Sequence, residues 1–348
     1  MPAWGEAGMV APGRGRWFVG LLLVAGVTVP PAAPGGAEIS SRVTLRCVTD
    51  GVPVALGPGR PADQRIVVEL CGAAPGRVVQ VLMSGATYGP TTWDLPYQPE
   101  RYSYVRAMNE AGIATLNVTR LGMAGSSHPH SSEVTTDSQI HIFSQLIDAV
   151  RGGRFGVAFD KVVIVGHSYG GVIAYGVGNR HAGKVDGVII AGLQHEFDPA
   201  FLREFWGNLH SANEEGGRFA NLDDGYLTSR PGQRHTFYRQ DQVDPKIIEM
   251  DEATKETFTR EDARTFPPVM GESEGITAPV LVLSSSAPAQ AERLVQADLR
   301  ITIGTLELGE ALSGTNVAPP SSLRRKPPPS GSNTMMRLGE PAERKTST

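Results

Sequence analysis

The sequence contains little cysteine, few aromatic residues and almost no excess of one charge. Two cysteines occur in 348 residues, and they form no zinc-like spacing with the eight histidines. The net charge of −4 gives no basis for binding nucleic acid. We therefore expect no metal site, no cofactor and no nucleic-acid partner. A content of 40% hydrophobic and 20% charged residues is ordinary for a globular protein.

No apolar run near the N-terminus reaches the roughly 20 residues that a membrane-spanning helix needs. Residues 17–29 carry no charge, follow Arg14 and Arg16, and precede small residues and prolines that end at Ala37. This order is typical of a secretory signal peptide. We predict that residues 1–37 are removed on export, so that the mature protein is secreted and has no stable membrane insertion. An uncleaved signal that anchors the chain is the alternative.

The two cysteines lie in short strand-like runs, Cys47 in residues 43–48 and Cys71 in residues 66–71. In an exported protein an even number of cysteines can be oxidised. We expect a disulfide that joins the two strands, and two buried free thiols are the alternative.

From Arg77 onward, apolar runs alternate with amphipathic stretches, which is typical of a parallel sheet with crossover helices. The expected strands are residues 78–83, 113–118, 162–165, 185–191 and 278–283, and the expected helices are residues 102–111, 139–151 and 171–180. Residues 193–275 separate the last two strands and are too many for a loop, so they predict a helical, lid-like insert.

These elements divide the chain behind the signal into four parts. Residues 38–192 are expected to be the N-terminal part of the core, and 193–275 the insert. Residues 276–313 form a divergent remainder of the core, with a helix near 290–299 and a strand near 300–306. Residues 314–348 are rich in Pro, Ser and Arg, which cannot bury enough apolar surface to offset the entropy of ordering. We expect this tail to be disordered.

The segment Gly166-His167-Ser168-Tyr169-Gly170 matches the pattern G-x-S-x-G. It lies between an apolar strand and a helix rich in small residues, which is the context of a nucleophile elbow. The glycines leave room for the sharp turn. The N–H of Tyr169 lies at a helix N-terminus, where developing negative charge is stabilised. Ser168 is therefore the candidate nucleophile, and a serine in an ordinary turn is the alternative.

A second match, Gly271 to Gly275 around Ser273, follows Phe266-Pro267-Pro268. No strand precedes it and no helix follows it in the pattern. We expect Ser273 to be an ordinary surface residue.

Residues from about 77 to 283 resemble the α/β-hydrolase superfamily, and residues 97–106 are similar to its exported actinobacterial serine hydrolases. Besides the elbow, Ser84-Gly85-Ala86 is similar to the family's His-Gly-x oxyanion turn, with Ser84 where histidine is usual. Residues 120–126 resemble its loop D-R-x-G-x-G-x-S, with Thr119 in the place of the Asp. The resemblance implies a mostly parallel sheet with flanking helices and Ser168 as nucleophile. It implies the N–H groups of Ala86 and Tyr169 as oxyanion donors. It further implies a small-molecule ester or related acyl substrate, and the aromatic residues of the insert favour a hydrophobic one.

The acid and the histidine of a catalytic triad are missing from their expected places. In this family they follow the nucleophile, with the acid after the strand at 278–283. Here no carboxylate occurs between that strand and Glu292, and all histidines lie at or before His235. A changed reading frame that replaced the C-terminal end, a rearranged triad that uses His195 or His235, and a non-catalytic binding protein all remain open. In each case other than the rearranged triad, hydrolysis is expected to be severely weakened.

Overall fold

The structure is a computed structural model that describes residues 45–72, 78–193, 197 and 199–283. The expected signal peptide, the helix and strand expected after residue 283, the expected disordered tail and His195 lie outside the described residues. Within the described ranges, no helix has both the length and the apolarity that crossing a membrane requires.

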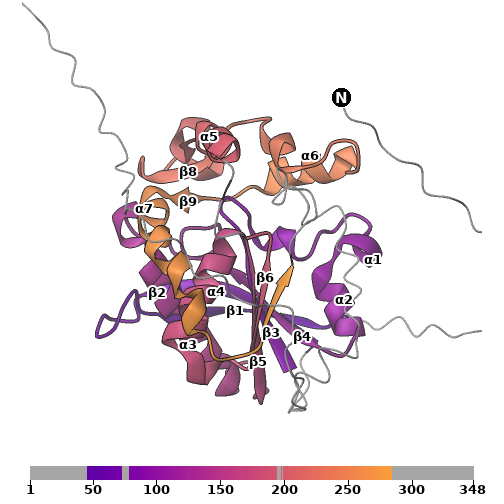
Figure 1. Cartoon of the computed structure of the whole chain (residues 1–348), viewed down its shortest axis with the longest axis vertical. Coiled ribbons are helices and arrows are strands. Elements are labelled where there is room, and N and C mark those ends of the chain that lie inside the picture. The colour runs from indigo at the N-terminus through magenta and orange to yellow at the C-terminus, as the bar shows by residue number, and fades with distance from the viewer. Residues whose placement is uncertain (1–44, 73–77, 194–196, 198, 284–348) are drawn as a thin grey trace, which may run out of the picture. The chain divides into compact units, whose positions relative to one another are not determined.

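A seven-stranded sheet in the order β1-β2-β4-β3-β5-β6-β10 forms the centre of the fold (Figure 1). Its strands are β1 (Cys47–Val54), β2 (Gln64–Cys71), β3 (Val78–Met83), β4 (Ala114–Thr119), β5 (Lys161–His167), β6 (Gly187–Ala191) and β10 (Val280–Leu283). β2 is antiparallel to both β1 and β4, and the strands from β4 to β10 are parallel. The predicted parallel sheet is confirmed.

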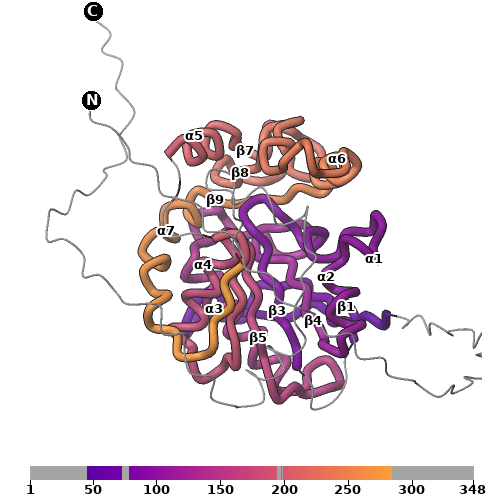
Figure 2. The backbone as a smooth tube through the Cα atoms, turned by 45° about the vertical axis from the view of Figure 1, so that its right-hand side comes forward, coloured from indigo at the N-terminus to yellow at the C-terminus, as the bar shows by residue number. Residues whose placement is uncertain are grey.

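Helices cover both faces of this sheet, and the alternation of side chains along β5 shows how. Val162 and Ile164 belong to the apolar cluster that contains α3 (Thr136–Arg151) and α4 (Tyr169–Arg180), whereas Val163 and Val165 pack with side chains of α2 (Tyr104–Glu110). Figure 2 shows α3, α4 and α7 (Arg260–Met270) together beside the strands. The helices of the core are α1 (Pro99–Tyr102), α2 (Tyr104–Glu110), α3 (Thr136–Arg151) and α4 (Tyr169–Arg180). Short 3₁₀ turns are η1 (Pro90–Thr92), η2 (Ser131–Glu133) and η3 (Ala182–Lys184). Because parallel strands are buried on both faces, they appear in the sequence as continuous apolar runs.

The first two strands differ from the prediction, because β1 begins at Cys47 and continues to Val54 through Pro53. A proline is tolerated there since β1 is an edge strand, which needs no N–H for a second neighbour. Cys47 lies directly opposite Cys71 in the antiparallel pair, and the two form a disulfide.

The insert between β6 and β10 is not purely helical, which corrects the sequence expectation. It contains a three-stranded antiparallel sheet in the order β7-β8-β9. Its elements are α5 (Pro199–Gly207), β7 (Leu209–Ser211), η4 (Ala212–Glu215), η5 (Gly217–Phe219), β8 (Tyr226–Ser229), η6 (Arg234–Phe237), α6 (Pro245–Thr254), β9 (Phe258–Thr259), α7 (Arg260–Met270) and η7 (Gly271–Gly275). The part from α5 to β9 lies over one end of the central sheet, while α7 returns along α3 and α4 (Figure 1).

The last described strand, β10, pairs with β6 at the edge of the sheet and exposes apolar side chains on both faces. Val280, Leu281 and Val282 are 43%, 37% and 53% exposed. Within the described part of the chain, this edge lacks the cover that the other parallel strands have.

Candidate active site

Ser168 lies at the turn between β5 and α4, in the strand–turn–helix context that the sequence predicted. Its backbone has φ 50° and ψ −121°, and it is one of three non-glycine residues with positive φ in the described ranges. Its N–H donates a hydrogen bond of 2.9 Å to the carbonyl of Ala191 at the end of β6. Such strained geometry persists only where surrounding contacts hold it, and it raises the side chain above the end of the sheet.

The two glycines of the motif are required by close backbone contacts. A Cβ on Gly166 would lie 2.3 Å from the carbonyl oxygen of Gly170, and a Cβ on Gly170 would lie 2.1 Å from that of Met83. Neither distance is compatible with a side chain, so the turn packs directly onto the end of β3.

The loop of residues 84–89, which follows β3, lies against the nucleophile. A Cβ on Gly85 would lie 3.2 Å from Cβ of Ser168, and the next residue, Ala86, lines the same pocket as Ser168. The predicted oxyanion turn is therefore beside the serine, as the proposed role of the Ala86 N–H requires.

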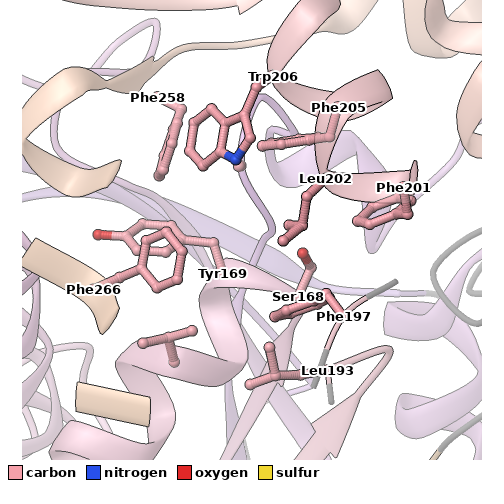
Figure 3. Close-up of a pocket in the computed structure, with 12 residues that line it drawn as sticks. Ser168, Tyr169, Leu193, Phe197, Phe201, Leu202, Phe205, Trp206, Phe258 and Phe266 are labelled. Carbon is pink, nitrogen blue, oxygen red and sulfur yellow. The ribbon is translucent and has the colours of Figure 1, made fainter. Parts of the chain in front are cut away.

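Ser168 opens into an apolar pocket of about 450 Å³, part of it open to solvent (Figure 3). The hydroxyl of Ser168 points toward Leu202 on α5. The pocket is lined by Ala86, Ser168, Tyr169, Val172, Leu193, Phe197, Phe201, Leu202, Phe205, Trp206, Phe258 and Phe266. Seven of these twelve residues are aromatic, so a bound molecule meets rings on several sides of the serine hydroxyl.

One wall of the pocket comes from the insert. Phe197, Phe201 and Phe205 recur every fourth residue, and their rings stack with centroids 6.2 and 6.1 Å apart. Phe201 and Phe205 lie four residues apart on one face of α5, which is the face toward the pocket, and Phe197 precedes the helix. The Phe205 ring also contacts Phe237, and the Trp206 ring contacts Phe258, so α5 rests on other parts of the insert.

Among the described residues that line this pocket there is no histidine, aspartate or glutamate. His235 is half-buried in η6, and its Nδ1 lies 2.7 Å from the carbonyl oxygen of Gly232. The structure therefore does not bring His235 to Ser168, and His195 lies outside the described residues.

The G-x-S-x-G motif does not predict a role for the imidazole next to the nucleophile, because position 167 is variable in the motif. His167 is 4% exposed, and neither ring nitrogen has a hydrogen-bond partner among the described residues. Its ring meets the edge of Tyr88, with centroids 5.5 Å apart. Burial, with a smaller effect of the nearby Arg234 guanidinium, lowers the pKa of His167 to about 4. The imidazole is thus neutral near pH 7, and it is a weak base.

A buried polar group behind the pocket was also not predicted. Arg120 donates a hydrogen bond of 3.0 Å to the carbonyl of Gly85, and its guanidinium lies 5.1 Å from the ring centre of Tyr169. The hydroxyl of Tyr169 donates to Asp262 at 2.6 Å. Burial raises the pKa of Asp262 to about 6, against the opposing effect of Arg120. Arg120 belongs to the segment that resembles the family loop, whereas Asp262 carries no sequence signal.

Comparison with known proteins places this geometry in a family. The model of the alpha/beta hydrolase family matches residues 80–313, which includes residues 276–313, the part expected to be a divergent remainder of the core. A carbendazim-hydrolysing esterase from Nocardioides sp. (strain SG-4G) is 28% identical over 119 residues, which are 30% of this chain and 46% of that protein. The chain thus matches less than half of the length of this curated relative.

Solved structures to which the chain is similar include a methylesterase from Arabidopsis and a monoacylglycerol lipase from Paleococcus ferrophilus. The first has a TM-score of 0.45 and 13% identity over 68% of this chain and 99% of its own. The second has a TM-score of 0.41 and 16% identity over 69% of this chain and 76% of its own. The parallel sheet, the turn that carries Ser168 and the family match over residues 80–313 together show that this chain belongs to the α/β-hydrolase family.

Proposed function

We propose that the chain is a serine-dependent hydrolase of hydrophobic esters or related acyl compounds, with Ser168 as the nucleophile. The observation that carries this proposal is the strained turn at Ser168, which directs its hydroxyl into an apolar pocket beside Ala86. A curated relative named as an esterase supports an ester-type substrate.

In this reaction Oγ of Ser168 forms a bond to the carbonyl carbon and loses its proton to a base. The oxygen that becomes negative accepts hydrogen bonds from the N–H groups of Ala86 and Tyr169. The alcohol then leaves with a proton, and water hydrolyses the acyl-enzyme to the acid and free Ser168. The lining suits an uncharged acyl or alcohol group, because a charged group would lose its hydration among aromatic rings without gaining a partner.

A non-catalytic binding protein on the same fold is the second candidate. It is supported by the apolar and largely aromatic lining of the pocket, which suits an uncharged ligand whether or not that ligand is cleaved.

A fluorophosphonate probe separates the two candidates, because it reacts only with an activated serine. We expect labelling of the full chain that disappears in Ser168→Ala and persists in the matched control Ser273→Ala. Absence of labelling in folded protein, checked by circular dichroism, would favour the binding protein. Labelling that persists in Ser168→Ala would assign the nucleophile to another residue.

We also propose that the protein is exported, on the strength of the charge pattern and apolar run of residues 1–37. N-terminal sequencing of protein recovered from the medium should then give a start between about residues 31 and 40. Recovery of full-length chain from the cytoplasm alone would rule export out.

A further inference from the structure

A buried arginine of the insert, Arg234, contacts the loop of residues 84–89. Nη1 of Arg234 donates a hydrogen bond of 2.7 Å to Oγ1 of Thr87, and both side chains are 0% exposed. The backbone of Thr87 has φ +59°, a conformation that is unfavourable for a β-branched residue. Outside contacts must therefore hold Thr87 in place.

Arg234 is itself fixed on the side of the insert. Its Nε and Nη2 donate to the two carboxylate oxygens of Asp251 at 2.8 and 2.7 Å, and the hydroxyl of Tyr238 donates to the same carboxylate at 2.8 Å. The guanidinium lies 4.0 Å from the ring centre of Tyr88. A bidentate pair that is also stacked on a ring leaves the arginine little freedom, so Nη1 has a defined position.

Two further contacts hold the same loop. The N–H of Glu256, in the insert, donates to the carbonyl of Thr87 at 2.8 Å, and Arg120, in the core, donates to the carbonyl of Gly85 at 3.0 Å. Ala86 therefore lies between one residue held from the core and one held from the insert.

We propose that Arg234 is a positioning residue for hydrolysis at Ser168, because it holds Thr87 and thereby fixes the N–H of the preceding Ala86 as an oxyanion donor. The inference rests on the proposed function. It makes the insert a part of the catalytic apparatus: the segment from η6 to α6 supports the oxyanion loop, while α5 forms the wall for substrate. Donors must be held within a fraction of an ångström to stabilise a transition state, so loosening Thr87 should reduce turnover rather than binding.

The competing explanation is that Arg234 only stabilises the insert through its ion pair with Asp251. Thr87→Val separates the two explanations, because it removes the acceptor oxygen and leaves the Arg234–Asp251 pair intact. Thr87→Ser is the matched control, since it keeps the oxygen. Arg234→Lys keeps the charge but cannot bind Asp251 through two nitrogens and reach Thr87 at once.

The experiment measures kcat and KM on a hydrophobic p-nitrophenyl ester, together with amide hydrogen exchange of the peptide that covers residues 84–89. For Thr87→Val and Arg234→Lys we expect kcat to fall about 10- to 100-fold with KM within about twofold, and exchange in the loop to accelerate. Exchange in β5 should stay unchanged, and Thr87→Ser should resemble the unsubstituted protein.

Equal kcat and equal loop exchange in Thr87→Val and Thr87→Ser would overturn the inference. If the unsubstituted chain hydrolyses no ester and takes no fluorophosphonate, the proposed function fails on its own. The exchange comparison then decides separately whether Arg234 holds the loop.

Discussion

The hydroxyl of Tyr169 donates a hydrogen bond of 2.6 Å to Oδ1 of Asp262, and both side chains are buried. Tyr169 follows Ser168 directly, and its ring lines the pocket, while Asp262 lies in the first turn of α7. The bond therefore links the start of α4, on which the nucleophile depends, to the last α-helix of the insert. Figure 3 shows the Tyr169 hydroxyl directed away from Ser168, so it is not a base for that serine.

Tyr169→Phe should destabilise the protein by about 1–3 kcal/mol, because it leaves a buried carboxyl without its hydroxyl donor. Asp262→Asn keeps an acceptor and removes the titrating group. In urea unfolding, the two substitutions together should cost less than the sum of their separate effects, with a coupling above about 0.5 kcal/mol. Additive effects would show that the hydrogen bond contributes nothing to stability.

Gly170→Ala should prevent stable folding, since its Cβ would lie 2.1 Å from the carbonyl oxygen of Met83 and backbone cannot yield as a side chain does. We expect a loss of at least about 3 kcal/mol in the free energy of unfolding. Gly183→Ala is the control, because nothing lies within 4 Å of its added Cβ. A Gly170→Ala protein that melts within a few degrees of the control would contradict the packing described for the turn.

The core could be predicted from the sequence where local pattern determines structure. β3 has the bounds expected of it, because a strand buried on both faces consists of consecutive apolar residues. The small sheet of the insert was not predicted. β7 and β9 have three and two residues, too few to show alternation, and they form through tertiary contacts.

In the candidate site, too, features set by adjacent residues could be predicted and features set by tertiary contacts could not. The turn at Ser168 and the loop at Ala86 are set by adjacent residues, so motifs were sufficient to locate them. The pair Tyr169–Asp262 joins positions 93 apart, and the pair Arg234–Thr87 joins positions 147 apart. No periodicity or motif relates such positions, and only the folded chain brings them together.

Two buried groups, His167 and Asp262, should make the free energy of unfolding depend on pH in opposite directions. His167 has a folded pKa of about 4 against an ordinary value of 6.5, so its unfolded state binds more protons between these values and stability falls on acidification. Asp262 has a folded pKa of about 6 against 3.8, so its folded state binds more protons and stability rises on acidification. Each effect is on the order of 3 kcal/mol.

Single variants isolate these two effects between pH 6.5 and 4. Compared with the unsubstituted protein, His167→Gln should gain relative stability as the pH falls, and Asp262→Asn should lose it. The free energy of unfolding in urea, measured at several pH values, gives both slopes. Parallel slopes in all three proteins would mean that neither group titrates as its burial implies.

The disulfide between Cys47 and Cys71 closes a loop with a sequence separation of 24. Its reduction should add two hydrogens to the mass and lower the free energy of unfolding by about 3 kcal/mol, because the unfolded chain regains the freedom of that loop. The double variant Cys47→Ser/Cys71→Ser should be equally destabilised and insensitive to reductant. If reductant still lowers the free energy of unfolding of this variant, that effect does not come from the Cys47–Cys71 disulfide.

Added imidazole should restore ester hydrolysis at Ser168 in a variant that has lost its base. The pocket beside the serine is partly open to solvent, so a small base from solution can reach Oγ and take its proton. The neighbouring His167 is buried with its pKa lowered to about 4, which makes it a weak base. The rate should rise with imidazole concentration and with the fraction of it that is neutral, which increases through pH 7. Ser168→Ala is the control, since imidazole also cleaves activated esters directly, and only the difference between the two proteins counts.

If the unsubstituted chain is fully active and imidazole adds nothing to that difference, a base is already in place. His195→Ala and His235→Ala would then identify it: loss of activity in the first alone would indicate a rearranged triad that uses the residue after β6.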